Sequence, residues 1–332
     1  MAPPTYQKIA AMSDLPTMSS PTQTPASPKA AMPGPSTSGS TWSYLKERFI
    51  EALLFLAALS SVLITLGIVV TLVYESYSFF AHVSLKEFLT DTMWTPLFAA
   101  PRFGIVPLVA GTLVTTGVAL AVALPIGTIV AIYLSEFAPA LLREIIKPVL
   151  ELLSAVPTVV YGYFALQFMS PLLQKLIPGL PTFNMLSAGV VMGIMIIPYV
   201  SSLSEDAMRA VPMSLREGAY ALGANRLITA RKVVYPAALS GIVASYILAI
   251  SRAIGETMIV AIAAGMQPNL TLDPREPAAT ITAFIVQVSL GDLPHGSIGY
   301  QSIFAAGITL FLMTLVFNIL GYILRKRFRE VY

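Results

Sequence analysis

Long stretches without any charged residue dominate the pattern of hydrophobic and polar positions along this chain. Four stretches, residues 52–74, 103–135, 176–204 and 293–324, contain no Asp, Glu, Lys or Arg. Each is longer than the ~20 residues that an α-helix needs to cross the hydrocarbon core of a bilayer. The pattern therefore predicts an all-α integral membrane protein.

Two less uniform apolar stretches raise the predicted number of membrane-spanning helices to six. They contain prolines or charged residues, and spans tolerate prolines where neighbouring helices satisfy the freed backbone groups. The six predicted spans are about 52–74, 106–134, 146–168, 185–203, 237–263 and 301–324. The apolar stretch 278–290 is too short to span, which favours a re-entrant or interfacial helix.

Basic residues predict the orientation of these helices. With the N-terminus inside, the cytoplasmic segments hold 15 Lys and Arg residues and the outer segments hold four. Because Lys and Arg concentrate on the cytoplasmic side, both termini are predicted to be cytoplasmic. The predicted organisation is a disordered cytoplasmic tail over residues 1–42, which is rich in Pro, Ser and Thr; a first helix with its outer loop over 43–105; and a core of five helices over 106–328.

Composition excludes several classes of protein. Of the 332 residues, 56% are hydrophobic and 11% are charged, whereas soluble domains are about 25% charged. A soluble enzyme and a nucleic-acid binder are therefore poor interpretations. The absence of cysteine excludes thiolate metal ligands, and His82 and His295 both lie in polar connecting segments. No metal site is predicted, and Met192 and Met195 are expected to pack in the core.

The sequence also lacks the motifs of ATP-hydrolysing and other enzymes. It has no Gly-Lys dipeptide and hence no P-loop, and neither H-E-x-x-H nor G-x-S-x-G occurs. The chain is therefore predicted not to be an enzyme. An ion-coupled carrier would need internal inverted repeats around a midplane site, and these are not visible in the six predicted spans.

Two charged residues in the fifth predicted span are candidates for a substrate path. Arg252 and Glu256 are four residues apart, which would place them on one face of a continuous helix, with Ser245 one heptad before Arg252. Charges in hydrocarbon are costly unless they face a polar cavity or a partner, so they usually serve function. A guanidinium can bind phosphate through two parallel hydrogen bonds. Arg252 is predicted to guide an anion while Glu256 prevents tight binding; the alternative is a structural pair that fixes helix packing.

Glu151 lies about one turn inside the third predicted span. Extension of its side chain to the interface, or pairing within the bundle, would explain a carboxylate at this depth. A role as a gate is the sharper alternative.

The inner segment 204–236 is long and contains well-defined helix signals. Ser214 followed by Glu217 fits a capping box, which predicts a helix over 215–222. Gly223 suits the left-handed position that commonly ends a helix. The segment therefore predicts a helix that ends at a glycine on the cytoplasmic face.

A second short helix is expected directly after this glycine. Asn225 can cap it and Pro236 can close it just before the fifth span, which completes a helical elbow. Leu215, Ala219 and Leu222 recur at helical spacing and predict an exposed apolar stripe. Such a stripe is typical of a surface that docks another protein, and an interfacial helix lying on lipid head groups is the alternative.

The spacing of residues in this elbow resembles the EAA loop of ABC importer permeases. That pattern is E-A-A, three residues, G, nine residues and I-x-L-P, and the chain keeps Glu217, Ala219, Gly223 and Pro236 in register. It departs at Gly218, Val233 and Tyr235, each of which keeps the position small or apolar. The resemblance implies a type I importer fold in which the elbow is the coupling helix, seated in a cleft of a nucleotide-binding subunit.

Further motifs within residues 106–328 are similar to the phosphate-specific branch of this family. They lie at 131–136, 148–153, 156–162 and 251–258. Met258 after Glu-Thr, and the Ile-Thr-Ala of 281–283, resemble the PstC type of permease rather than its PstA partner. In the phosphate permeases the Arg-Glu pair is a feature of the family, which favours a functional role for Arg252 and Glu256.

The resemblance implies the transmembrane permease of an ATP-driven inorganic phosphate importer in a prokaryotic inner membrane. Its expected partners are a PstA-type permease, a dimer of ATPase subunits, an extracytoplasmic phosphate-binding protein and membrane lipid, with no nucleic acid. ATP would be used by the ATPase subunits, so no cofactor is expected on this chain. Because importers of molybdate, sulfate or phosphonate share the EAA loop, another oxyanion is the alternative substrate.

Overall fold

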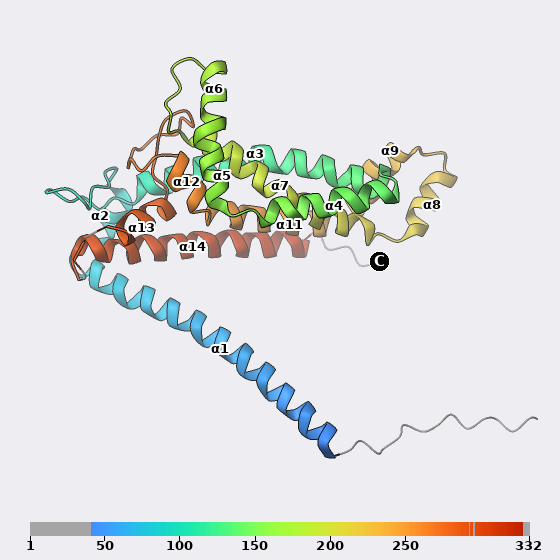
Figure 1. Ribbon diagram of the computed structural model, residues 1–332, viewed down its shortest axis with the longest axis horizontal. Coiled ribbons are helices and arrows are strands. Elements are labelled where there is room, and N and C mark those ends of the chain that lie inside the picture. Colours follow the sequence, from blue (N-terminus) through green and yellow to red (C-terminus); the bar gives the residue numbers. More distant parts are fainter. Residues whose placement is uncertain (1–40, 292, 295, 328–332) are drawn as a thin grey trace, which may run out of the picture. The chain divides into compact units, whose positions relative to one another are not determined.

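The computed structural model describes residues 41–327 except 292 and 295, and its regular structure is helical (Figure 1). One isolated antiparallel bridge joins Trp94 to Phe103. The chain divides into two compact units, residues 1–63 and 64–332. Nearly all of the predicted disordered tail lies outside the described residues, and the division at residues 42 and 105 stays a prediction.

Four long helices correspond to four of the predicted spans. They are α1 (Thr41–Phe80), α3 (Val106–Ile132), α7 (Met185–Arg209) and α14 (Ile298–Arg327), and each is long and apolar enough to cross a membrane. The predicted starts of α3 and α7 are confirmed. The helices α1, α7 and α14 extend beyond the predicted bounds because helical hydrogen bonding continues into polar flanks that a count of apolar residues leaves out.

The third predicted span is not one straight helix. It consists of α4 (Ala140–Ala155) followed by α5 (Thr158–Phe164), the π-helical segment η2 (Ala165–Met169) and α6 (Ser170–Leu176), and the two parts meet at 88°. The break falls before Pro157, where Val156 is extended with ψ of 131°. A proline disfavours helical geometry in the residue before it, which explains why the helix ends there.

The fifth predicted span is interrupted twice. Helix α11 (Leu239–Ile254) meets the preceding helical segment, which ends with α10 (Tyr235–Ala237), at 72°. A second break separates α11 from α12 (Met258–Ala263). The prediction of one helix over 237–263 is therefore wrong. Among the described residues four helices can span a membrane by length and composition, or up to six if each bent pair is one span.

The short apolar stretch near residue 280 forms α13 (Ile281–Ser289), whose N-terminus is capped by the side chain of Thr280. One face of this helix is buried, with Ala283 and Val288 at 0% and 1% exposed, whereas Ile285 and Val286 are half-buried and Ser289 is exposed. The helix packs against α12, α3 and α14, and whether it is re-entrant or interfacial stays a prediction. It shares an apolar cluster with the loop that contains α2 (Leu85–Thr90), in which aromatic rings meet edge to face, including Phe79, Phe88, Trp94, Phe103 and Phe284.

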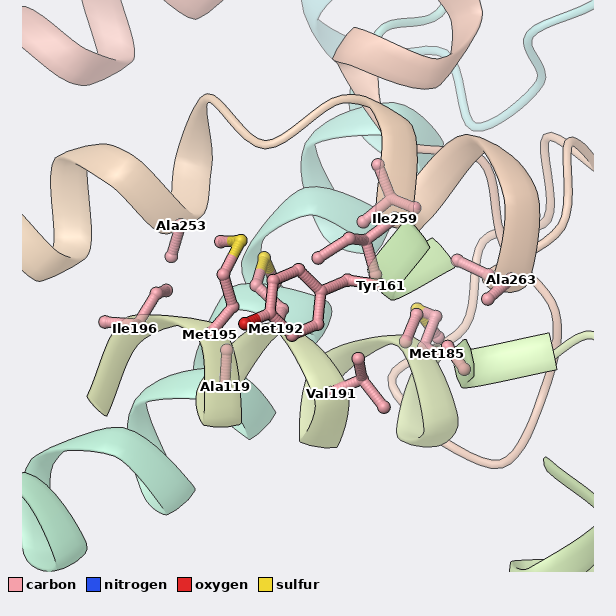
Figure 2. Packing of buried hydrophobic residues seen from close by; sticks show 14 of the residues in the cluster. Ala119, Tyr161, Met185, Val191, Met192, Met195, Ile196, Ala253, Ile259 and Ala263 are labelled. Carbon is pink, nitrogen blue, oxygen red and sulfur yellow. The ribbon is translucent and has the colours of Figure 1, made fainter. Parts of the chain in front are cut away.

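Close packing of α3 on α7 forms the centre of the bundle, with α11 against α7 and α14. Small residues at this contact allow the backbones to approach: a Cβ at Gly193 would lie 2.7 Å from the carbonyl oxygen of Ala119. Figure 2 shows Met192 and Met195 beside Tyr161 of α5 in the buried cluster. Their predicted role in packing is confirmed.

Candidate functional site

Arg252 lies on α11 and faces α7. Its guanidinium carbon is 4.4 Å from the ring centroid of Tyr199, close enough for a cation–π interaction. The Nε atom of Arg252 is buried and has no hydrogen-bond partner in the described part of the chain. A buried donor without a partner is costly, so this N–H is suited to receive an anion. Tyr199 carried no signal in the sequence that could have linked it to Arg252.

Glu256 does not share a helix face with Arg252, so that prediction is wrong. Helix α11 ends at Ile254, Gly255 follows as its C-cap, and Glu256 lies in the break before α12. The buried carboxylate accepts hydrogen bonds at 3.1 Å and 3.4 Å from the first two backbone N–H groups of α12. No ion pair joins Arg252 to Glu256, because the spacing of four residues brings side chains together only on an unbroken helix.

The backbone of the break is also held from outside. The hydroxyl of Thr282, on α13, donates to the carbonyl oxygen of Glu256 at 2.7 Å. The start of α12 is therefore fixed both by the carboxylate of Glu256 and by a contact from α13.

Ser245 is buried between α11 and α7. Its hydroxyl lies 2.8 Å from the hydroxyl of Ser204 and 2.8 Å from the carbonyl oxygen of Ile242. Ser245 and Arg252 thus both face α7, as their heptad spacing predicts. The hydroxyl is already engaged in helix packing, so a place for Ser245 in the substrate path stays a prediction.

The predicted helical elbow is present at one end of the bundle, with α2 and α13 at the opposite end (Figure 1). It consists of α8 (Met213–Ala221), α9 (Arg226–Thr229) and the π-helical segment η3 (Ala230–Val234). Gly223 has φ of +82°, which confirms its left-handed position. Asn225 accepts a hydrogen bond from the N–H of Ile228 at 2.8 Å, which confirms its role as a cap.

The predicted capping box is wrong. Helix α8 begins at Met213 with Pro212 as its N-cap, and no side chain caps it. Ser214 is already inside the helix, where its side chain no longer stands at the N-cap. The extended backbone of Pro212, with ψ of 140°, ends the preceding turn and starts α8 two residues earlier than predicted.

The predicted apolar stripe is not one exposed face. Ala219 is buried, Leu215 is half-buried against the cluster at the end of α7, and only Leu222 is exposed, at 91%. Leu215 and Ala219 attach α8 to the bundle, and the exposed surface of α8 includes Glu217 and Gly218. The roles assigned to Leu215, Leu222 and Pro236 in coupling stay predictions.

Arg216 is the charged residue of α8 that the sequence interpretation missed. Its side chain is 10% exposed and forms an ion pair of 2.9 Å with Glu136, whose side chain is 5% exposed. Glu136 belongs to η1 (Tyr133–Phe137), a π-helical segment that continues α3. The two residues are 80 positions apart, and no local pattern links them.

Glu151 is exposed on α4, a helix that buries none of its side chains. The ion pairs of α4 instead run through Lys147, which contacts Glu205 at 3.0 Å and Asp206 at 2.6 Å on α7. A gate role for Glu151 stays a prediction. No group of three or more His, Asp or Glu side chains in the described residues could hold a metal ion, and His295 lies outside those residues.

Comparison with known proteins shows consistent similarities. Residues 123–330 match the family described as "Binding-protein-dependent transport system inner membrane component". The chain is 34% identical to the probable ABC transporter permease protein YqgH of Bacillus subtilis, a match that covers 83% of this chain and 88% of the relative. It is 31% identical to the phosphate transport system permease protein PstC of Haemophilus influenzae, covering 86% and 96%.

Solved structures share this fold at low sequence identity. A bacterial ABC transporter involved in the import of the acidic polysaccharide alginate matches with a TM-score of 0.61 and 15% identity, covering 87% of this chain and 99% of that one. The inward-facing MetNI methionine ABC transporter matches with a TM-score of 0.50 and 18% identity, covering 68% and 95%. The chain therefore belongs to the binding-protein-dependent inner membrane components, as a multi-pass permease subunit of an ABC importer that is not itself catalytic.

Proposed function

We propose that this chain, together with a second related permease of the PstA type, forms the path by which an ATP-driven importer moves inorganic phosphate across the inner membrane. The similarity to permeases named for phosphate transport supports this substrate, with 31% identity in Haemophilus influenzae and 29% in Methanocaldococcus jannaschii. The similarity to the alginate and methionine transporters supports the fold alone.

The state of Arg252 is the observation that carries the proposal. Its guanidinium lies over the ring of Tyr199 at 4.4 Å, and the edge of a guanidinium plane carries the N–H groups that can bind an anion. The buried Nε has no partner among the described residues. A phosphate oxygen on that edge would satisfy it, and a second oxygen could receive a parallel hydrogen bond.

The elbow is proposed to face the cytoplasm and to dock the ATPase dimer. Fifteen of the Lys and Arg residues fall on the elbow side of the predicted topology and four on the other, in line with the rule for cytoplasmic loops. Glu217, Gly218, Ala219 and Gly223 would form or shape the docking surface. The binding protein would deliver phosphate at the opposite end of the bundle, near α13, and Pro236 would join the elbow to the fifth span.

Reconstitution of the complex with its ATPase and binding protein in liposomes tests this function. We expect uptake of radiolabelled phosphate that requires ATP and that unlabelled phosphate inhibits, whereas sulfate, molybdate and phosphonate at the same concentration do not. Preferential uptake of another oxyanion would replace phosphate as the substrate. Uptake that needs an ion gradient and no ATPase would refute the importer assignment.

A further inference from the structure

We propose that the buried ion pair between Arg216 and Glu136 is the link through which a displacement of the elbow moves α3 and α7. This inference rests on the proposed function, in which the elbow contacts the ATPase. It assigns a positioning role to two side chains that do not touch the transported anion.

All three guanidinium nitrogens of Arg216 are engaged. Two of them, Nη2 and Nε, donate to the carboxylate of Glu136 at 2.9 Å and 3.4 Å. Nη1 donates to the carbonyl oxygen of Val211 at 2.6 Å, and Nη2 also donates to that of Met208 at 2.9 Å. One side chain of α8 therefore holds the end of α3, through η1, and the end of α7 at the same time.

Apart from Arg216, α8 contacts the bundle through Ala219 and the half-buried Leu215. Of its nine residues only Arg216 and Ala219 are buried, so the helix has little apolar surface with which to define its position. A buried ion pair resists separation strongly, because removal of one partner would leave an uncompensated charge. Arg216 thus fixes the position of α8 against the bundle.

Glu136 is itself held in place. It lies in η1, and Ser135 donates to its carboxylate at 2.9 Å. Segment η1 continues α3, and α3 packs along α7. Helix α7 in turn carries Tyr199, which contacts Arg252. A movement of α8 that keeps the ion pair intact therefore reaches the contact between Tyr199 and Arg252 through two closely packed helices.

Two single variants, Glu136→Gln and Arg216→Gln, test the link in the reconstituted complex. The exposed Arg226 of the same elbow supplies the matched control: it lines the same cavity as Glu136 but forms no ion pair with it, so Arg226→Gln removes the same charge and leaves the pair in place. The measurements are the amount of co-purified ATPase, the rate of ATP hydrolysis and the phosphate imported per ATP. We expect assembly and hydrolysis within about twofold of wild type, and a fall of at least tenfold in phosphate per ATP for both Glu136→Gln and Arg216→Gln.

Glu136→Gln keeps the shape of the side chain and leaves the bonds of Arg216 to Met208 and Val211 in place, so it carries the test if Arg216→Gln fails to assemble. An unchanged ratio of phosphate to ATP in assembled Glu136→Gln complexes would overturn the inference and reduce the pair to a structural contact. An equal fall in Arg226→Gln would overturn it as well. Absence of ATP-driven phosphate uptake in the wild-type complex would refute the proposed function instead.

Discussion

Replacement of Gly223 by valine tests whether the geometry of the elbow matters for transport. Gly223 follows the C-cap of α8 with φ of +82°, and its N–H donates to the carbonyl oxygen of Tyr220 at 2.9 Å. The N–H of Ala224 donates to the carbonyl oxygen of Ala219 at 3.0 Å, which completes a Schellman motif. No atom lies within 4 Å of a Cβ added at Gly223, so a larger side chain meets no steric obstacle.

The cost of Gly223→Val therefore comes from the backbone alone. A left-handed conformation costs an ordinary L-residue about 1–2 kcal/mol, and a β-branched residue is a particular outlier there. A penalty of that size changes the population of a conformation by about 5- to 30-fold. We expect the equilibrium to shift away from the present elbow geometry by this factor. Phosphate uptake should fall as that geometry becomes less populated, while the protein still inserts into the membrane.

Two further variants separate strain from side-chain size. Gly223→Asn should retain most of the uptake, because Asn tolerates the left-handed region. Gly218→Ala adds a methyl group with open space around it and matches the alanine of the E-A-A pattern, so we expect the proposed docking surface to be kept, with wild-type uptake or slightly higher stability. Uptake is measured in liposomes at equal protein abundance. Equal uptake by Gly223→Val and Gly223→Asn would refute the reasoning from backbone strain.

Three other predictions concern the bundle and its loops. Arg252→Gln should lower phosphate uptake by about 10- to 100-fold, the worth of one charge-assisted hydrogen bond, and Arg252→Lys should lower it less; equal losses would contradict a role for the planar guanidinium. A cysteine at Val288, 1% exposed, should react with an impermeant maleimide at least tenfold more slowly than one at Leu290, 82% exposed, whereas similar rates would contradict the packing of α13. Hydrogen bonds from Arg275 lower the pKa of Asp273 to about 2. The contribution of this pair to stability is therefore complete above about pH 4 and is lost as the pH falls through 2. An NMR titration of the carboxyl group should show this pKa, and Arg275→Gln should return it to its ordinary range.

The membrane-spanning helices could be predicted from the sequence because lipid imposes one dominant requirement on them. A span must be apolar and long enough to cross the hydrocarbon core, and the length of each charge-free stretch indicates both properties. The breaks were harder to predict. Pro157 and Gly255 lie within predicted spans, where proline and glycine are often tolerated, so the presence of such a residue alone does not show that it interrupts the helix.

The candidate site was predictable where it depends on local backbone rules. The left-handed Gly223 and the cap at Asn225 follow from interactions within a few residues, and both are confirmed. The partner of Arg216 was not predictable, because Glu136 is 80 residues away and meets it only after α3 and α7 have packed. The expected pairing of Arg252 with Glu256 failed because it assumed an unbroken helix.

The interruption of the fifth span at Gly255 has a mechanical consequence. A continuous helix transmits rotation and translation along its whole length. An interruption of its backbone hydrogen bonds divides it into two segments that can move relative to each other. The first segment, α11, carries Arg252 close to its C-terminus. The second, α12, is held at its start by the Glu256 carboxylate and by Thr282. Any movement of α11 relative to α12 would be absorbed at Gly255, so the displacement between these two helices is expected beside the arginine.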